Sequence, residues 1–516
     1  MPLLPKNDPL HPRWLLDTEK WTILEYQNIK EDVVKQGYGI ISYTWGRWAK
    51  WVEQPPDLPS GLLWRVPLVT DLPLSLARTV VSSMKIRYVW WDWMCVPQEP
   101  LQDTPAKLRG ELLKAKGEEV GKQMAIYKGA KKSIVWLHLT HWGKTSAIER
   151  LLMNQLQKKD LPSYLTAVTA LISDMQKAES WLTSGWTLQE GVLLSETHLL
   201  DHGGATLHGS HFIHEGQAAV VNLTAGLTKF AIDIATAFLK LSVTQKGSDQ
   251  DEVVQYIRAS EKNYQFVAQF LSRLVRSGLI AYTKKSPLYI LAGKFSRRFG
   301  VDKDECWALL GALELENVTP WYEATPGIDQ VKSVFFESLL QKYQWSILLV
   351  AGASADNQKL ARLPWHTKVT DGKHLPLGIY FDVNWKPKLP TLSWKRPAKP
   401  QDDAIHIQNK NGAPFAVVKL REKGSAECRR YEQLPTSDGA DYIRVLSVKP
   451  LDHSSALFIP IADLESRSKT PGARYIEIIP TGTTSTGKFR GVIDIWATKD
   501  SLEEVSLTKL SMLSGV

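Results

Sequence analysis

The chain has 516 residues, of which 43% are hydrophobic and 23% charged, and its formal net charge is +9. This length exceeds what one hydrophobic core supports, so it predicts two or three domains of ordinary globular composition. The basic clusters are short, as at Lys131-Lys132 and Lys395-Arg396. They exclude the concentrated stripe of a dedicated nucleic-acid binder, so the excess positive charge indicates mainly a solvated surface, which also favours small anionic ligands.

The sequence lacks the features of a secreted or membrane protein. Its N-terminus has no apolar signal core, and no apolar run approaches the roughly 20 residues that cross a bilayer. Its three cysteines, Cys95, Cys306 and Cys428, are far apart and odd in number, so they imply no disulfide framework. We therefore expect a cytoplasmic protein without a membrane span.

The first 200 residues alternate strand and helix patterns. Four short apolar runs predict strands at Tyr38–Tyr43, Arg87–Asp92, Ser133–Leu137 and Thr197–Leu200. Helical spacing is seen between them at Pro73–Met84, Glu118–Ala130 and 181–194. Continuous apolar strands separated by helices favour a parallel sheet covered on both faces. The pattern therefore predicts a doubly wound α/β domain at 1–210.

The periodicity changes twice further along the chain. Residues 211–384 have helical spacing, strongest at Ala231–Leu241, Asp251–Leu274 and Val331–Leu349. A linker or edge segment rich in proline and lysine follows at 385–400. From 401 to 516 the spacing is two, and Asn411-Gly412 between apolar runs predicts a hairpin. We expect a small β-sandwich or barrel there.

Polar and aromatic residues follow the predicted strands at their carboxyl ends, where doubly wound sheets bind ligands. Trp45, Gly46 and Arg47 follow the first strand, and Asp92 ends the second. Thirteen of the twenty tryptophans precede residue 191, which indicates either an aromatic core or a site lined with aromatic rings. Trp186 and Glu190 are four residues apart, on one face of a predicted helix.

Four blocks of the chain resemble the fungal heterokaryon-incompatibility (HET) domain. They occur in the family's order, and they are Tyr38-x-x-Ile-Ser-Tyr-Thr-Trp-Gly46, Tyr88-Val-Trp-Trp-Asp-Trp-Met-Cys-Val-Pro-Gln98, Met124-x-Ile-Tyr-x-x-Ala130 and Trp186-Thr-Leu-Gln-Glu190. Trp307-Ala-Leu-Leu-Gly311 is similar to a segment common downstream of such domains. The resemblance implies a cell-death effector with a flavodoxin-like, TIR-like fold.

HET domains are related to TIR domains, many of which cleave NAD with a glutamate four residues after a tryptophan. The resemblance therefore implies an NAD-type glycohydrolase with Glu190 as its catalytic acid. NAD or a related nucleotide would be the substrate, and no cofactor would be required. Trp45, Gly46, Arg47, Asp92 and Trp186 would bind that ligand, by ring stacking, by contacts with phosphate and by hydrogen bonds to ribose.

Several alternatives stand beside this interpretation. The family usually has an arginine at the position of Ser184, so binding of a nucleotide phosphate is in question, and Arg47 is a candidate replacement. Thr187-x-x-Glu190 also fits a helix capping box. Asp92 could instead bind the backbone amides of the next turn, and Cys95 is either a nucleophile or a buried structural residue.

The histidines and the overall function also leave alternatives. Five histidines lie between His198 and His214, but the nearby glycines predict a loop, so we assign no metal site. The domain could act without catalysis, as a module that associates with itself or with a partner protein. It could also be a recruited biosynthetic enzyme with an aromatic pocket for a small apolar substrate.

Overall fold

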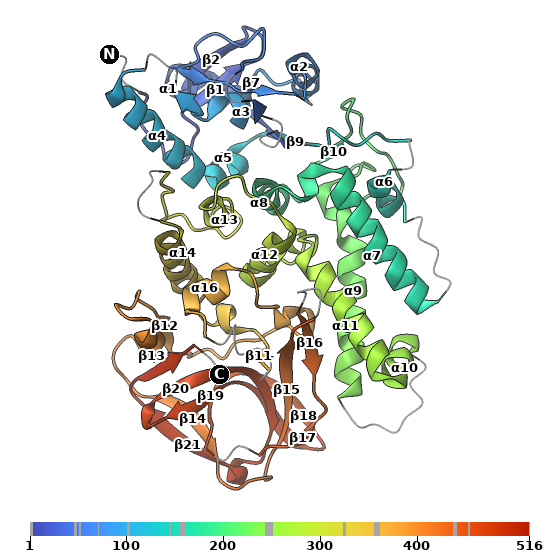
Figure 1. Cartoon of the computed structure of the whole chain (residues 1–516), viewed down its shortest axis with the longest axis vertical. Coiled ribbons are helices and arrows are strands. Elements are labelled where there is room, and N and C mark those ends of the chain that lie inside the picture. Colours follow the sequence, from blue (N-terminus) through green and yellow to red (C-terminus); the bar gives the residue numbers. More distant parts are fainter. Residues whose placement is uncertain are drawn as a thin grey trace.

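The computed structural model describes residues 4–45, 49–50, 53–70, 72–100, 104–143, 146–154, 160–242, 251–322, 327–354, 362–436, 441–452 and 455–514. An α/β region comes first, a helical region follows, and a large multi-stranded sheet lies at the C-terminal end (Figure 1). Within these described ranges, no helix combines the length and the apolar character needed to cross a bilayer.

The first sheet contains all four predicted strands. Its order is β10-β9-β3-β7-β1-β2. The strands are β1 (Trp14–Asp17), β2 (Thr22–Glu25), β3 (Gly39–Ser42), β7 (Tyr88–Trp90), β9 (Lys132–Trp136) and β10 (Leu199–Leu200). Strands β10, β9, β3 and β7 are mutually parallel, as their apolar sequences predict. Their carboxyl ends therefore share one edge of the sheet.

An N-terminal hairpin, which the sequence analysis did not predict, extends this sheet. Strands β1 and β2 are antiparallel, and β1 pairs with β7 in the same antiparallel sense. The turn between them has Trp21 in the left-handed region at φ 52°. The buried carboxylate of Asp17 accepts hydrogen bonds from the backbone N–H groups of Glu19 and Lys20 and so holds the turn.

The helices of the α/β region are shorter or more broken than their spacing predicts. The helix predicted over Glu118–Ala130 is largely confirmed, but it is divided between two helices, because the chain leaves helical geometry at Lys122, with φ −102° and ψ 11°. The Lys122 ammonium turns inward there, 2.6 Å from the carboxylate of Glu119. The helices are α1 (Tyr26–Gln36), α2 (Leu74–Ser82), α3 (Asp92–Cys95), α4 (Ala106–Gly121), α5 (Gln123–Gly129), α6 (Ala147–Leu152), α7 (Leu161–Ala178) and α8 (Gly185–Leu193).

The middle of the chain is helical, as predicted, with one further correction. The helical spacing predicted over Asp251–Leu274 is confirmed, but it is divided between two helices, because Ser260 is extended and its hydroxyl accepts from the N–H of Asn263 as an N-cap. The helices are α9 (Ala225–Leu241), α10 (Glu252–Ala259), α11 (Glu261–Arg276), α12 (Pro287–Gly293), α13 (Asp304–Trp307), α14 (Ile328–Tyr343) and α16 (Trp365–Thr370), with the 3₁₀ turn η4 (Ile280–Tyr282) before α12.

The C-terminal sheet has long, strongly curved strands (Figure 1). Its main path is β12-β13-β22-β20-β19-β18-β14-β21, and β15 adds to β20 and leads to β16 and β17. The strands are β11 (Gly352–Ala353), which pairs with β15, and β12 (Thr391–Ser393), β13 (Ala404–Gln408), β14 (Phe415–Leu420), β15 (Glu427–Leu434), β16 (Tyr442–Val445), β17 (Lys449–Pro450), β18 (Leu457–Arg467), β19 (Thr470–Thr481), β20 (Thr483–Trp496), β21 (Leu502–Leu507) and β22 (Leu510–Leu513). Strand β12, from the segment rich in proline and lysine, forms one edge.

The hairpin predicted at Asn411-Gly412 is wrong in its strand pairing. A turn does form, with Gly412 at φ 67° and its N–H bound to the carbonyl of Asn409 at 3.0 Å. The flanking strands do not pair with each other, however. Strand β13 pairs with β12 and β22, and β14 pairs with β18 and β21. Partners distant in sequence thus outweigh the local turn signal.

Candidate functional site

Glu190 lies at the carboxyl edge of the parallel sheet and is held by side chains from two other elements. The hydroxyl of Ser42, the last residue of β3, donates a hydrogen bond to Glu190 Oε2. Tyr127, from α5, hydrogen-bonds the same carboxyl group. Trp181 Nε1 in turn donates to Ser42 Oγ at 2.8 Å. The site therefore has a continuous polar chain from an indole, through a hydroxyl, to an acid.

Burial controls the charge of this acid. Glu190 is 6% exposed, and burial raises its pKa from 4.5 to about 8, aided by the negative charge of Asp92. The hydrogen bonds from Ser42 and Tyr127 act in the opposite direction, because they stabilise the carboxylate. At neutral pH the free protein thus holds Glu190 mainly as the neutral acid.

Asp92 is the second acid at this edge, and it is partly exposed. Trp45 Nε1 donates to Asp92 Oδ2 at 2.8 Å, and the N–H of Trp93 donates to Oδ1 at the same distance. Burial raises the pKa of Asp92 to about 6, and these two bonds oppose the shift. Asp92 therefore accepts a hydrogen bond from a backbone amide, as its alternative structural role predicts. Its negative charge also raises the pKa of Glu190.

Residues 38–190 match the family model described as heterokaryon incompatibility protein (HET). The chain carries a HET domain. The match begins before β3, ends at Glu190, and takes in the four sequence blocks that resemble the family. No curated protein and no solved structure matches the chain.

The structure brings only some of the predicted site residues of the HET domain together. Trp45, Asp92 and Glu190 lie around one edge of the sheet. Trp186, also predicted to line this site, donates its indole N–H to Asp304 Oδ2 at 3.1 Å, in the downstream α13. Gly46 and Arg47 lie outside the described residues.

The capping-box interpretation of Glu190 is wrong. Helix α8 has Ser184 at its N-cap position, so Thr187 lies within the first turn and does not precede the helix. The Thr187 hydroxyl donates to the carbonyl oxygens of Trp181 and Ser184. The Glu190 carboxyl group instead binds Ser42, across the sheet edge.

The sequence analysis did not single out several residues of the site. Ser42 lies near the end of a predicted strand and Tyr127 lies in the third family block, so both positions carried a usable signal, whereas Trp181 lies outside the four blocks. A further buried acid, Glu179, accepts hydrogen bonds from the N–H groups of Trp181 and Leu139 and from the Thr140 hydroxyl. Burial raises its pKa to about 7. Glu179 thereby fastens the loop after β9 to the turn that precedes α8.

Most tryptophans of the HET domain serve its core. The indoles of Trp64, Trp90, Trp91, Trp93, Trp136 and Trp181 are among the largest fully buried side chains. Trp45 and Trp186 are only partly buried, and each donates its N–H to a different acid. Cys95 is also buried, and burial raises the pKa of its thiol to about 12, so it has the character of a structural cysteine.

The histidines of the 198–214 segment bind separate partners. His202 Nδ1 lies 2.7 Å from the carbonyl oxygen of His138, and His211 Nε2 lies 2.8 Å from that of Leu152. His208 Nε2 lies 2.9 Å from the Thr206 hydroxyl. Over the described ranges, no three His, Cys, Asp or Glu side chains are placed to share a metal ion.

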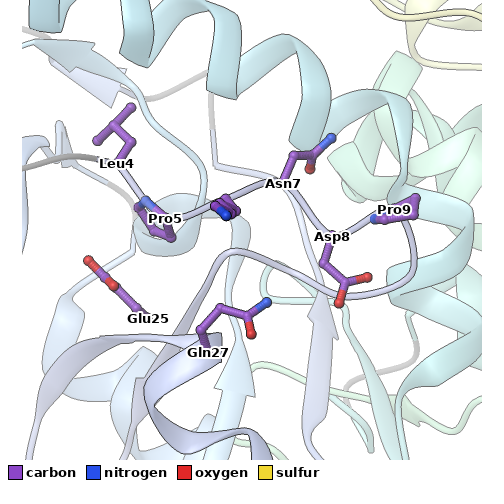
Figure 2. Close-up of a pocket in the computed structure, with 8 residues that line it drawn as sticks. Leu4, Pro5, Asn7, Asp8, Pro9, Glu25 and Gln27 are labelled. Atoms are coloured by element: carbon purple, nitrogen blue, oxygen red, sulfur yellow. The ribbon is translucent and has the colours of Figure 1, made fainter.

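A surface pocket of about 590 Å³ lies elsewhere, between the N-terminal segment and the start of α1. Figure 2 shows Asn7, Asp8 and Pro9 of that segment on one side and Glu25 and Gln27 on the other. None of the residues that surround Glu190 lines this pocket. Its position gives it no part in the chemistry of the Glu190 site.

Proposed function

We propose that the HET domain hydrolyses the N-glycosidic bond of NAD or a related nucleotide, with Glu190 as its catalytic acid. The observation that carries this proposal is a buried carboxyl group bound to Ser42 and Tyr127 and coupled to a second acid, Asp92. A strongly shifted carboxyl group next to another carboxyl group is typical of sites that handle charge during bond cleavage.

The chemistry suits a carboxylate that becomes charged when substrate binds. The positively charged nicotinamide ring would lower the pKa of Glu190, because an opposite charge nearby favours the ionised form. As the bond to C1′ of the ribose breaks, its electron pair goes to the nicotinamide nitrogen and positive charge grows on the sugar. The Glu190 carboxylate stabilises that charge, and water then adds to C1′ and releases a proton.

Asp92 and Trp45 have supporting roles in this proposal. The Asp92 residue is partly exposed, and in this proposal its carboxylate accepts further hydrogen bonds from ribose hydroxyls. The Trp45 indole lies beside it and stacks against Trp93, with ring centroids 6.3 Å apart. The exposed part of that indole offers an aromatic surface for a flat ring.

The strand arrangement supports a TIR-like, flavodoxin-like fold for this domain. Taken in chain order, β3, β7, β9 and β10 lie side by side in the order 2-1-3-4, which is the beginning of the flavodoxin-like order. In such sheets ligands bind outside the carboxyl ends of the strands, near the first strand. Ser42 ends β3 and Asp92 follows the neighbouring β7 at that edge. The helical and β regions would then sense or regulate a cytoplasmic death effector.

The test is nicotinamide release from NAD by the purified full chain, followed by mass spectrometry. Glu190→Gln should reduce the rate by a factor on the order of 10³, because it removes the charge that stabilises the transition state. Glu196→Gln, which changes an exposed acid just beyond α8, is the matched control and should keep the wild-type rate. Asp92→Asn should raise KM, because it weakens ribose binding.

Two results would refute the hydrolase. One is wild-type protein that leaves NAD and related nucleotides intact in a metabolite panel; consumption of a small apolar compound instead would point to a biosynthetic enzyme. The other is cell death that persists in full, together with NAD loss, when Glu190→Gln is expressed in cells. Cell death without NAD loss would point to a self-associating module.

A further inference from the structure

The helix that carries Glu190 is also held by residues downstream of the HET match. Gly185 N–H donates to the carbonyl of Arg298 at 2.9 Å, and Arg298 N–H donates to the carbonyl of Thr183 at 2.8 Å. The N–H groups of Gly311 and Ala312 both donate to Gln189 Oε1. Figure 1 shows α8 beside α5 of the HET domain and beside α13 of the helical region.

Arg297 is the centre of this support. The residue is 7% exposed, and Nη1 of its guanidinium donates to the carbonyl oxygens of Trp181 at 3.0 Å and Ser184 at 3.2 Å. The same nitrogen lies 3.3 Å from Thr187 Oγ1. Nη2 donates to the Tyr282 hydroxyl at 2.7 Å. One planar group thus binds the turn before α8, the first turn of α8 and the η4 segment.

Tyr282 connects this guanidinium to the acid. Its ring packs so closely on Gly191 that a Cβ there would lie 2.3 Å from Tyr282 Cε1. The Tyr282 ring also lies beside Trp181, with centroids 5.8 Å apart. The pKa of Tyr282 is raised by burial, lowered by Arg297 and raised by the charge of Glu190, so its hydroxyl is coupled to both groups.

We infer that Arg297 is a positioning residue, which holds α8 so that Glu190 stays buried against Ser42 at the sheet edge. This inference rests on Glu190 being the functional acid of the proposed function. It also implies that the functional unit extends beyond the family match, which ends at Glu190, and includes residues 278–312. The guanidinium has protein partners on both terminal nitrogens, so its role is to fix the helix and not to bind substrate.

The test reads the position of Glu190 without any substrate. Trp181 Nε1 binds Ser42, which binds Glu190, so the ¹⁹F signal of 5-fluorotryptophan at Trp181 should titrate with the acid. The Trp181 signal is assigned as the one that is lost in the Trp181→Phe variant. The other groups that titrate around Glu190 are Asp92, Tyr43, Tyr127 and Tyr282. Glu190→Gln should abolish the midpoint near 8 and so separate Glu190 from them.

Arg297→Gln should lower that midpoint by about one unit or more, because Glu190 loses burial. Hydrogen–deuterium exchange in peptides covering 181–194 should accelerate at least about tenfold, since α8 opens locally. The midpoint and the exchange rate of Arg297→Lys should lie between those of the wild type and Arg297→Gln, because an ammonium group cannot reproduce the planar geometry of the guanidinium. Arg298→Gln removes the same charge from an exposed neighbouring side chain and should match the wild type in both measurements.

Wild-type titration and exchange in Arg297→Gln would overturn the positioning role. If that variant fails to fold, Tyr282→Phe takes its place, because it removes only the hydroxyl that accepts from Nη2. It should shift the midpoint and the exchange of 181–194, and no change in either would overturn the inference. Failure of NAD hydrolysis in the wild type refutes the proposed function alone, since neither measurement uses NAD.

Discussion

Glu190→Gln should stabilise the protein, and the gain should grow with pH. The folded pKa of about 8 lies above the ordinary 4.5, so folding keeps a proton that the unfolded chain loses. The free energy of unfolding therefore falls as pH rises from about 4.5 and becomes level above about 8. At 1.36 kcal/mol per pKa unit, the loss reaches about 3 kcal/mol at pH 7 and about 5 kcal/mol at pH 9.

Glutamine has the shape of glutamic acid, and its amide oxygen can accept the Ser42 hydrogen bond, but it carries no charge at any pH. Urea unfolding followed by tryptophan fluorescence should give the two proteins the same midpoint at pH 4. The variant should be more stable at pH 7 and more stable again at pH 9, while Glu196→Gln should follow the wild type throughout. Equal midpoints at pH 9, or a less stable variant there, would show that Glu190 is not held in a raised-pKa environment.

Two further substitutions test the packing described above. Gly191→Ala places a Cβ 2.3 Å from Tyr282 Cε1, so it should lower stability by roughly 1–3 kcal/mol, measured as a fall in Tm. Asp494→Asn removes the acid that binds Arg429 at 2.7 Å and Arg474 at 2.8 Å, which leaves two buried guanidinium groups uncompensated. It should cost about 3–5 kcal/mol and expose the C-terminal sheet to limited proteolysis; resistance equal to the wild type would contradict this.

The parallel strands were predictable because each is a short apolar run that needs no distant information to be recognised. The N-terminal hairpin was not predictable, because its turn contains Trp21 at φ 52°, a position where Asn or Gly is the usual signal. At Asn411-Gly412 the signal was present, but the pairing was decided by strands far along the chain. Local patterns thus predicted the elements better than their partners.

The same difference between local elements, which the sequence predicts, and their distant partners, which it does not, is seen within the site. The spacing of Trp186 and Glu190 correctly placed both on α8, but the indole binds Asp304, which is 118 residues away, and the acid binds Ser42, which is 148 residues away. Whether Glu190 is charged depends on burial, and that burial comes from β3, α5 and the segment around Tyr282 together. The family motif therefore draws attention to Glu190 in the sequence, whereas the protonation state of this residue is a property of the folded chain. This is why a variant at Arg297, outside the motif, tests the site as directly as one within it.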